Sequence, residues 1–223
     1  MGVSGVPSSA KSVALEPAAI EAGDREFLLE LARTALSVAV ESASPSLLSD
    51  AMNGVRLLPL WRRRGACFVT MFEADELRGC MGVVDPSTRL SEAVVEATIA
   101  SALDDPRFWP IGPSELGSIQ LDISVLGPLT PVDDPHLVRL GVDGVAIDVN
   151  GHRALLLPEV ATEHGLDGQE LWRTLCRKAA LPADAWLRSD AHLLLFRTIR
   201  FGGPACYSPE GCGLNSSDAE LMQ

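Results

Sequence analysis

The sequence predicts an α+β fold in which helices flank a mainly antiparallel sheet. Its elements run helix, hairpin, helix, strand, hairpin, helix, strand. Hairpins outnumber the possible parallel crossovers, which favours an antiparallel or mixed sheet over a doubly wound parallel one. Residues 119–125 alternate between apolar and polar side chains, which is the pattern of a strand with one buried face.

The first half of the chain contains two predicted helices around a hairpin. Apolar side chains recur at helical spacing across residues 24–40, which indicates an amphipathic helix. Residues 66–72 and 77–84 have the pattern of two strands joined by a polar turn. A helix is expected over residues 90–103, and Pro106 stops it because proline has no N–H to donate.

The second half continues with a further hairpin, a helix and a strand. Residues 144–149 and 153–157 flank the pair Asn150-Gly151, which tolerates the two positive φ angles of a type I′ turn. A capping-box pattern at its start predicts a helix over residues 167–180. Residues 192–200 are expected to form the last strand.

Composition and charge exclude several classes of protein. The chain has 223 residues, 47% of them hydrophobic, and a net charge of -12, so its surface should repel a nucleic acid. No apolar run reaches the ~20 residues that span a bilayer. Residues 1–12 lack the basic-then-apolar order of a signal peptide. We therefore expect a cytoplasmic protein without membrane or nucleic-acid partners.

Both ends of the chain differ from the middle. Residues 1–20 are small and interrupted by glycine, serine and proline, which predicts a mobile N-terminal arm. Residues 202–223 have a similar composition and are expected to form a mobile C-terminal tail. The folded domain should therefore span residues 21–201.

One segment of the first hairpin carries a family resemblance. It reads Leu77-Arg78-Gly79-Cys80-Met81-Gly82 and resembles the LRGC(I/V)G signature of the AMMECR domain family, which includes protein A of the AmmeMemoRadiSam system. Four further blocks match in the same order: residues 105–108 (DPRF), 124–126 (SVL), 157–160 (LPEV) and 176–179 (CRKA). Together the resemblance covers about residues 26–201.

The resemblance implies a fold with two subdomains within residues 21–201. The larger part would be built from both ends of the chain, the smaller part would be inserted between them, and the LRGC-type segment would border a cleft where they meet. The family name records an association with Memo-like and radical-SAM proteins, and its activity is not settled. Ala180 departs from the family pattern, because members usually have glycine there, which suits a left-handed helix cap.

Cys80 is the candidate reactive group of this segment. Side chains alternate along a strand, so Arg78 and Cys80 should project from the same face. A guanidinium beside a thiol favours the thiolate, which would make Cys80 a nucleophile, a redox thiol or a modification site. Gly79 and Gly82 would leave the backbone open to a ligand or partner. The alternative is that both sheet faces are covered and Cys80 is a small buried hydrophobe.

Three further residues are candidates for the same site. His164 is the most plausible base for a nucleophilic cysteine, and Glu159 is a candidate carboxylate for acid–base chemistry or, alternatively, a loop cap. Arg107 is a candidate anion-binding residue, although pairing with a neighbouring aspartate is the stronger expectation.

The sequence contains no recognised metal or cofactor motif. C-x-x-C, H-E-x-x-H, EF-hand and nucleotide-binding loops are all missing, so we expect no cofactor and no metal. Cys206 and Cys212 lie in the predicted tail, where a disulfide or a soft-metal site is conceivable and two separate thiols are favoured.

Two functions remain in competition. The first is a partner or target of Memo-like and radical-SAM proteins, recognised through the LRGCMG strand. The second is a small-molecule enzyme that uses Cys80 as nucleophile or redox thiol.

Overall fold

The computed structural model describes residues 20–41, 52–53 and 59–206 and confirms the predicted α+β class. The helices are α1 (Ala22–Glu41), α3 (Leu90–Leu103), α4 (Glu159–Glu163) and α5 (Gly168–Lys178). The strands are β1 (Cys67–Glu73), β2 (Glu76–Val83), β3 (Ile119–Leu126), β4 (Thr130–Pro131), β5 (Gly144–Val149), β6 (His152–Leu156), β7 (His192–Phe196) and β8 (Thr198–Pro204). No helix in these ranges is long and apolar enough to cross a membrane.

The strands form two four-stranded antiparallel sheets, and the chain divides into two compact units. Among the described residues, unit 1 contains 22–41, 52–53, 59–123 and 202–206, and unit 2 contains 20–21 and 124–201. Unit 1 is thus assembled from segments far apart in the sequence, with unit 2 inserted between them. The alternation within each strand did not reveal the second sheet, because it identifies a buried face and not a neighbouring strand.

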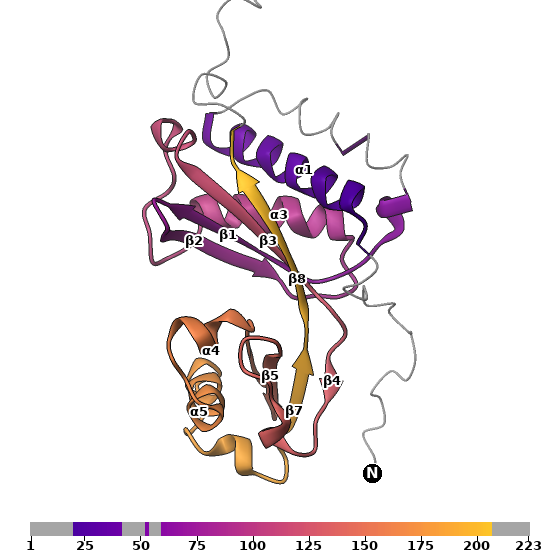
Figure 1. The fold of residues 1–223 in the computed structure, drawn as a ribbon, viewed down its shortest axis with the longest axis vertical. Helices are drawn as coiled ribbons and strands as arrows, with labels where there is room; N and C mark the ends of the chain where they lie inside the picture. The colour runs from indigo at the N-terminus through magenta and orange to yellow at the C-terminus, as the bar shows by residue number, and fades with distance from the viewer. Residues whose placement is uncertain (1–19, 42–51, 54–58, 207–223) are drawn as a thin grey trace, which may run out of the picture. The chain divides into compact units, whose positions relative to one another are not determined.

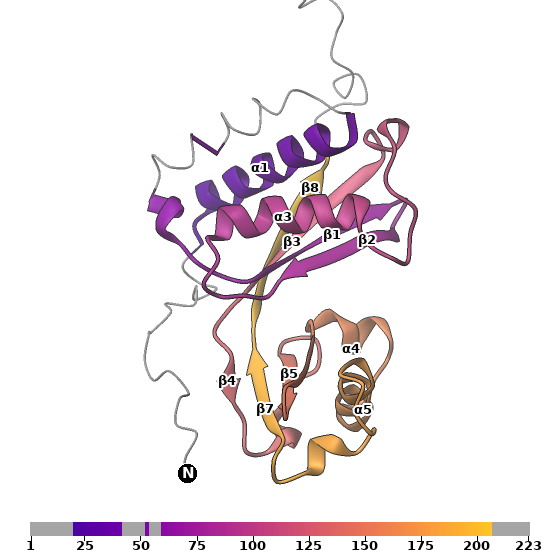
Figure 2. The ribbon, with the colours of Figure 1, turned by 180° about the vertical axis from the view of Figure 1, so that it is seen from behind.

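Unit 1 is a four-stranded sheet with two helices on one face. Its strand order is β2-β1-β3-β8. Figures 1 and 2 show α1 and α3 side by side on the same face of this sheet. The core between them consists of apolar side chains that each layer turns inward, such as Leu31 and Ala35 of α1, Val94 of α3 and Val69 of β1.

Unit 2 has the strand order β4-β7-β5-β6 and packs α5 against β5 and β6. Trp172 of α5 is fully buried and stacks on Trp186, with ring centroids 6.4 Å apart. The predicted turn between β5 and β6 is confirmed, because Asn150 and Gly151 have φ angles of 53° and 88°. The predicted capping box at the start of α5 is also present, since the Asp167 carboxylate accepts a hydrogen bond from the N–H three residues on.

The last part of the chain differs from the prediction. The strand expected over residues 192–200 is divided into β7, which belongs to the sheet of unit 2, and β8, which belongs to the sheet of unit 1. β8 continues to Pro204, so the first residues of the predicted C-terminal tail are part of the sheet. The glycines at these positions prevented the prediction of a longer strand, because glycine is usually depleted in strands. The predicted terminal arm and tail otherwise fall on residues 1–19 and 207–223, outside the described residues.

Ala180 occupies the left-handed conformation that the family resemblance implied, with a φ of 56°. Leu181 N–H donates to the carbonyl of Cys176, and Ala180 N–H donates to that of Arg177, which together form a Schellman cap on α5. Alanine adopts this conformation at a cost of ~1 kcal/mol that glycine avoids. Ala180→Gly should therefore raise the free energy of unfolding by about 1 kcal/mol in urea denaturation. No gain would mean that the cap tolerates Cβ without strain.

Candidate functional site

β2 is the edge strand of unit 1 and carries the LRGCMG segment. α3 packs against one face of β2, and Gly79 is buried on that face. A Cβ atom at Gly79 would overlap the carbonyl oxygen of Ser101 and lie 3.2 Å from its carbonyl carbon. Glycine is needed here because the backbone of α3 approaches the strand, so Gly79 does not offer an open surface to a ligand.

The Ser101 hydroxyl is hydrogen-bonded into the ladder between β1 and β2. It accepts from Met81 N–H at 2.8 Å and donates to the carbonyl of Val69 at 2.7 Å. Met81 and Val69 are opposite one another in the antiparallel register. Because the Ser101 hydroxyl is buried and both donates and accepts a hydrogen bond, it fixes the position of α3 along β2.

Cys80 points away from α3, because successive side chains of a strand alternate. Its cross-strand neighbour is Thr70, whose hydroxyl donates to the Cys80 Sγ at 3.3 Å. Cys80 is half-buried, whereas the other free cysteines, Cys67 and Cys176, have no exposed surface. The described helices of unit 1 lie on the other face of the sheet, so neither of them seals the sulfur.

Asp105 holds the outer edge of β2 at Cys80. Its carboxylate, only 2% exposed, accepts a hydrogen bond from Cys80 N–H at 2.9 Å. The same carboxylate accepts from Nε and Nη2 of Arg107 at 3.0 and 2.7 Å and from the Arg107 backbone N–H. Chiefly because of the hydrogen bonds from the Arg107 side chain, the pKa of Asp105 falls from 3.8 to about 2. Asp105 is therefore an ionised anchor and a poor base.

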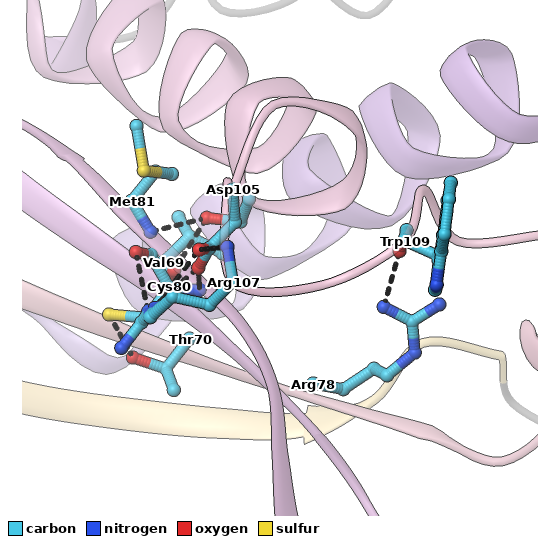
Figure 3. A network of polar contacts seen from close by, with 9 residues as sticks. Val69, Thr70, Arg78, Cys80, Met81, Asp105, Arg107 and Trp109 are labelled. Carbon is cyan, nitrogen blue, oxygen red and sulfur yellow. Dashed lines mark hydrogen bonds and ion pairs between the residues drawn. The ribbon is translucent and has the colours of Figure 1, made fainter.

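Arg107 is the guanidinium that accompanies the thiol (Figure 3). Its Nη2 lies 3.4 Å from the Cys80 carbonyl oxygen, and its guanidinium carbon is 5.3 Å from the centroid of the Phe108 ring. The Arg107 pKa is raised mainly by the hydrogen bond to Asp105 and to a smaller extent by Cys80 itself. The predicted pairing of Arg107 with a neighbouring aspartate is thus observed, and 54% of its side chain remains exposed.

Arg78 does not accompany Cys80, contrary to the prediction. Its Nε donates to Glu115 at 2.7 Å, and its Nη1 and Nη2 donate to the carbonyls of Trp109 and Pro110 at 2.7 and 3.4 Å. Figure 3 shows the Arg78 side chain reaching towards Trp109 and away from the thiol. The register of β1 and β2 shifts between Met71 and Phe72, so Arg78 has no opposite residue in the ladder, and its long side chain follows its acceptors. Arg78 therefore fixes the loop after α3.

Gly82 also has a packing role. A Cβ atom at Gly82 would lie 2.5 Å from carbons of the Phe68 ring, which faces it from β1. The space that the sequence predicted for a ligand or partner is therefore filled by the protein's own side chain.

The proposed acid–base residues lie in the other unit. Glu159 is the first residue of α4 and half-buried, and His164 is exposed at the end of the same helix. All four histidines of the chain fall in unit 2, so the unit that carries Cys80 contains none. The units are described separately, and the pairing of His164 or Glu159 with Cys80 stays a prediction.

The remaining cysteines differ in chemistry. Burial raises the pKa of Cys67 to about 12 and also raises the pKa of Cys176, so both thiols are poor nucleophiles at neutral pH. Cys206 is disulfide-bonded, which corrects the preference for two separate thiols in the tail. Cys212 lies outside the described residues. Within the described ranges, no cluster of three or more histidine, cysteine or acidic side chains could hold a metal.

The sequence interpretation missed three members of this site. Thr70 was predictable only from the exact register of the hairpin, and Asp105 was seen as a partner of arginine but not as an acceptor for the strand. Trp109, with 87% of its surface exposed, lies in the loop that Arg78 fixes. The site is therefore a half-buried thiol with a hydroxyl donor and a fixed guanidinium, and the exposed Trp109 belongs to the loop that Arg78 holds.

Fold and site thus define an α+β protein with two antiparallel sheets and an accessible cysteine on an edge strand. The AMMECR1 family model matches residues 29–201, and the chain belongs to this family. The family resemblance read from the sequence is therefore confirmed.

The relatives are archaeal proteins whose names state no activity. A protein of Methanothermobacter thermautotrophicus is 37% identical over 180 residues, covering 78% of this chain and 91% of the relative. A protein of Aeropyrum pernix is 36% identical over 197 residues, covering 84% and 82%. The crystal structure of an uncharacterised protein from Pyrococcus horikoshii aligns with a TM-score of 0.73 at 31% identity, covering 86% of this chain and 96% of that one.

Proposed function

We propose that the protein acts together with Memo-like and radical-SAM partner proteins, and that β2 presents Cys80 to them as the group they recognise or modify. The observation that carries this proposal is the contrast among the free cysteines. Among the free cysteines of the described residues, only Cys80, in the LRGCMG segment, is not buried, and it lies on an edge strand of its sheet.

The surroundings of Cys80 favour a recognised group over a self-sufficient catalyst. A nucleophilic cysteine normally needs a base within hydrogen-bond reach. Within the described residues, Cys80 forms hydrogen bonds with Thr70, Asp105 and Arg107, and none of these side chains is an effective base for a thiol at neutral pH. Trp109 adds a large exposed aromatic side chain of the type that anchors partner proteins.

The alternative is a small-molecule enzyme that uses Cys80 as nucleophile or redox thiol. The hydroxyl of Thr70, which donates to Sγ, and the guanidinium of Arg107, which lies beside Cys80, support it, because such donors are typical neighbours of reactive thiols. This alternative requires a base from unit 2, and His164 and Glu159 are the candidates. His164→Gln should then slow alkylation of Cys80, whereas a partner-recognition role predicts no change.

Thiol accessibility gives the first test. Under native conditions at neutral pH, iodoacetamide should alkylate Cys80 more than about 100-fold faster than Cys67 or Cys176, because burial hinders access to both and suppresses their thiolates. Peptide mass spectrometry reads out each site. In denaturant the three rates should converge, and equal native rates for Cys80 and Cys67 would remove the basis of the proposal.

Modification in the cell gives the second test. Protein purified from its own cells should show added mass on the peptide that contains Cys80, or should co-purify with a Memo-like or radical-SAM protein. Cys80→Ser should lose both signals, and Cys176→Ser should lose neither. An unmodified mass together with the absence of either partner would contradict the proposal.

A further inference from the structure

We propose that Cys80 and Arg107 form one site that selects small carboxylate-bearing molecules for reaction at the thiol. The carboxylate would bind the exposed edge of the guanidinium while the reactive carbon meets Sγ. This inference rests on the proposed role of Cys80 as the reactive group and adds the chemical class of its ligand.

The first support is the unused donor edge of Arg107. Asp105 takes Nε and one side of Nη2, and the Cys80 carbonyl lies near Nη2. Within the described part of the chain, Nη1 makes no hydrogen bond, and 54% of the side chain is exposed. Nη1 can therefore donate to one oxygen of a carboxylate, and the second oxygen could share the Nη2 donor that makes only a long, 3.4 Å contact with the Cys80 carbonyl.

The second support is that this edge is held in place before a ligand arrives. Asp105 is buried and binds Arg107 through two side-chain nitrogens, and the Phe108 ring lies against the guanidinium. Fixing an arginine in this way during folding removes most of the side-chain entropy that binding would otherwise cost. The ion pair is close to neutral overall, so selectivity should come from directed N–H donors more than from net charge.

The third support is the proximity of donor and thiol. The Nη2 of Arg107 donates to the backbone carbonyl of Cys80, and Cys80 is one of the groups that raise the Arg107 pKa. A carboxylate on the guanidinium edge would bring a carbon one or two bonds away next to the sulfur. Such positioning raises the rate of the bimolecular step.

Iodoacetate and iodoacetamide test this directly, because they differ only in the carboxylate. In both reactions the Cys80 thiolate attacks the methylene carbon, an S–C bond forms, the C–I bond breaks and iodide leaves, and the thiol proton has passed to solvent. The ratio of the two rates at Cys80 therefore isolates recognition of the carboxylate from the nucleophilicity of the sulfur.

We expect the iodoacetate-to-iodoacetamide ratio at Cys80 to be about 10-fold higher in the wild type than in Arg107→Gln. Arg107→Lys, which keeps the charge but loses the fork, should fall between them. Arg89→Gln is the matched control: it removes the same charge from unit 1, beside the first residue of α3, roughly 20 Å of helix away from Asp105. Its ratio should equal that of the wild type.

The outcomes separate this inference from the proposed function. If Arg107→Gln and Arg107→Lys both leave the ratio unchanged while Cys80 still reacts with iodoacetamide, carboxylate selection is refuted and the accessible thiol remains. If Cys80 does not react with either reagent in the wild type, both proposals fail. Arg107→Gln would be judged unfolded if Cys67 became reactive. In that case the iodoacetate-to-iodoacetamide ratio of Arg107→Lys tests the inference, and a ratio equal to that of the wild type would refute a role for the planar guanidinium.

Discussion

Gly79→Ala should destabilise the protein by about 3 kcal/mol, the larger of the two effects expected from unit 1. The added Cβ would overlap the carbonyl oxygen of Ser101, which is backbone of α3 and cannot rotate away. Relief requires α3 to move off β2, and that movement would stretch the hydrogen bonds from the Ser101 hydroxyl to Met81 and Val69. Urea denaturation followed by circular dichroism measures the loss.

Gly117→Ala is the control for this substitution. Gly117 also belongs to unit 1, and a Cβ there meets no heavy atom within 4 Å. Its effect should stay within about 0.5 kcal/mol, which separates the steric clash from the general change in chain entropy. A Gly79→Ala protein as stable as Gly117→Ala would show that α3 is not packed as closely on β2 as described.

Asp105→Asn should cost about 2 kcal/mol at neutral pH. The buried carboxylate accepts from Cys80 N–H and from Arg107, and its pKa is held at about 2 against an ordinary value of 3.8. Asparagine keeps one acceptor oxygen but loses the charge that Arg107 pairs with. The guanidinium should then lose its fixed position beside Cys80.

The pH dependence follows from the direction of that pKa shift. Because the Asp105 pKa is lower in the folded state, the stabilisation is complete above about pH 4 and disappears as the pH falls from 3.8 to about 2. The stability gap between wild type and Asp105→Asn should therefore close over that interval. Asp104→Asn, an exposed neighbour, should show little gap at any pH. A gap that persists unchanged at pH 2 would mean that charge is not the cause.

Much of the fold was accessible from the sequence, because local patterns reflect local physics. The Asn150-Gly151 turn was predictable because few residues tolerate a positive φ twice in succession. The start of α5 was predictable because its capping box lies within four residues of sequence. The extension of β8 through Gly202 and Gly203 was not predictable, because those glycines form part of a strand only through their neighbours in the sheet.

The sequence proposed Cys80 as the centre of a candidate site, and its prediction that the Arg78 guanidinium accompanies the thiol was wrong. Alternation predicted Arg78 and Cys80 on one face of the strand, but the register shifts at Arg78, and its guanidinium is bound by Glu115 and the Trp109 carbonyl. Arg107, which was predicted as an anion-binding residue or a partner of a neighbouring aspartate, lies beside Cys80 because Asp105 bonds both to it and to the strand edge. Sequence spacing contains no information on such a shared acceptor.

By itself, the sequence determined the α+β class, the family and most helices and strands, and it singled out Cys80 as the candidate reactive group, since periodicity, turn chemistry and motifs all act over a few neighbouring residues. Only the tertiary structure decided which guanidinium accompanies that cysteine, why Gly79 and Gly82 must lack side chains, and that the strands form two sheets. Each of these depends on contacts between segments distant in the chain, where packing and hydrogen-bond geometry select one arrangement among many that the local patterns allow.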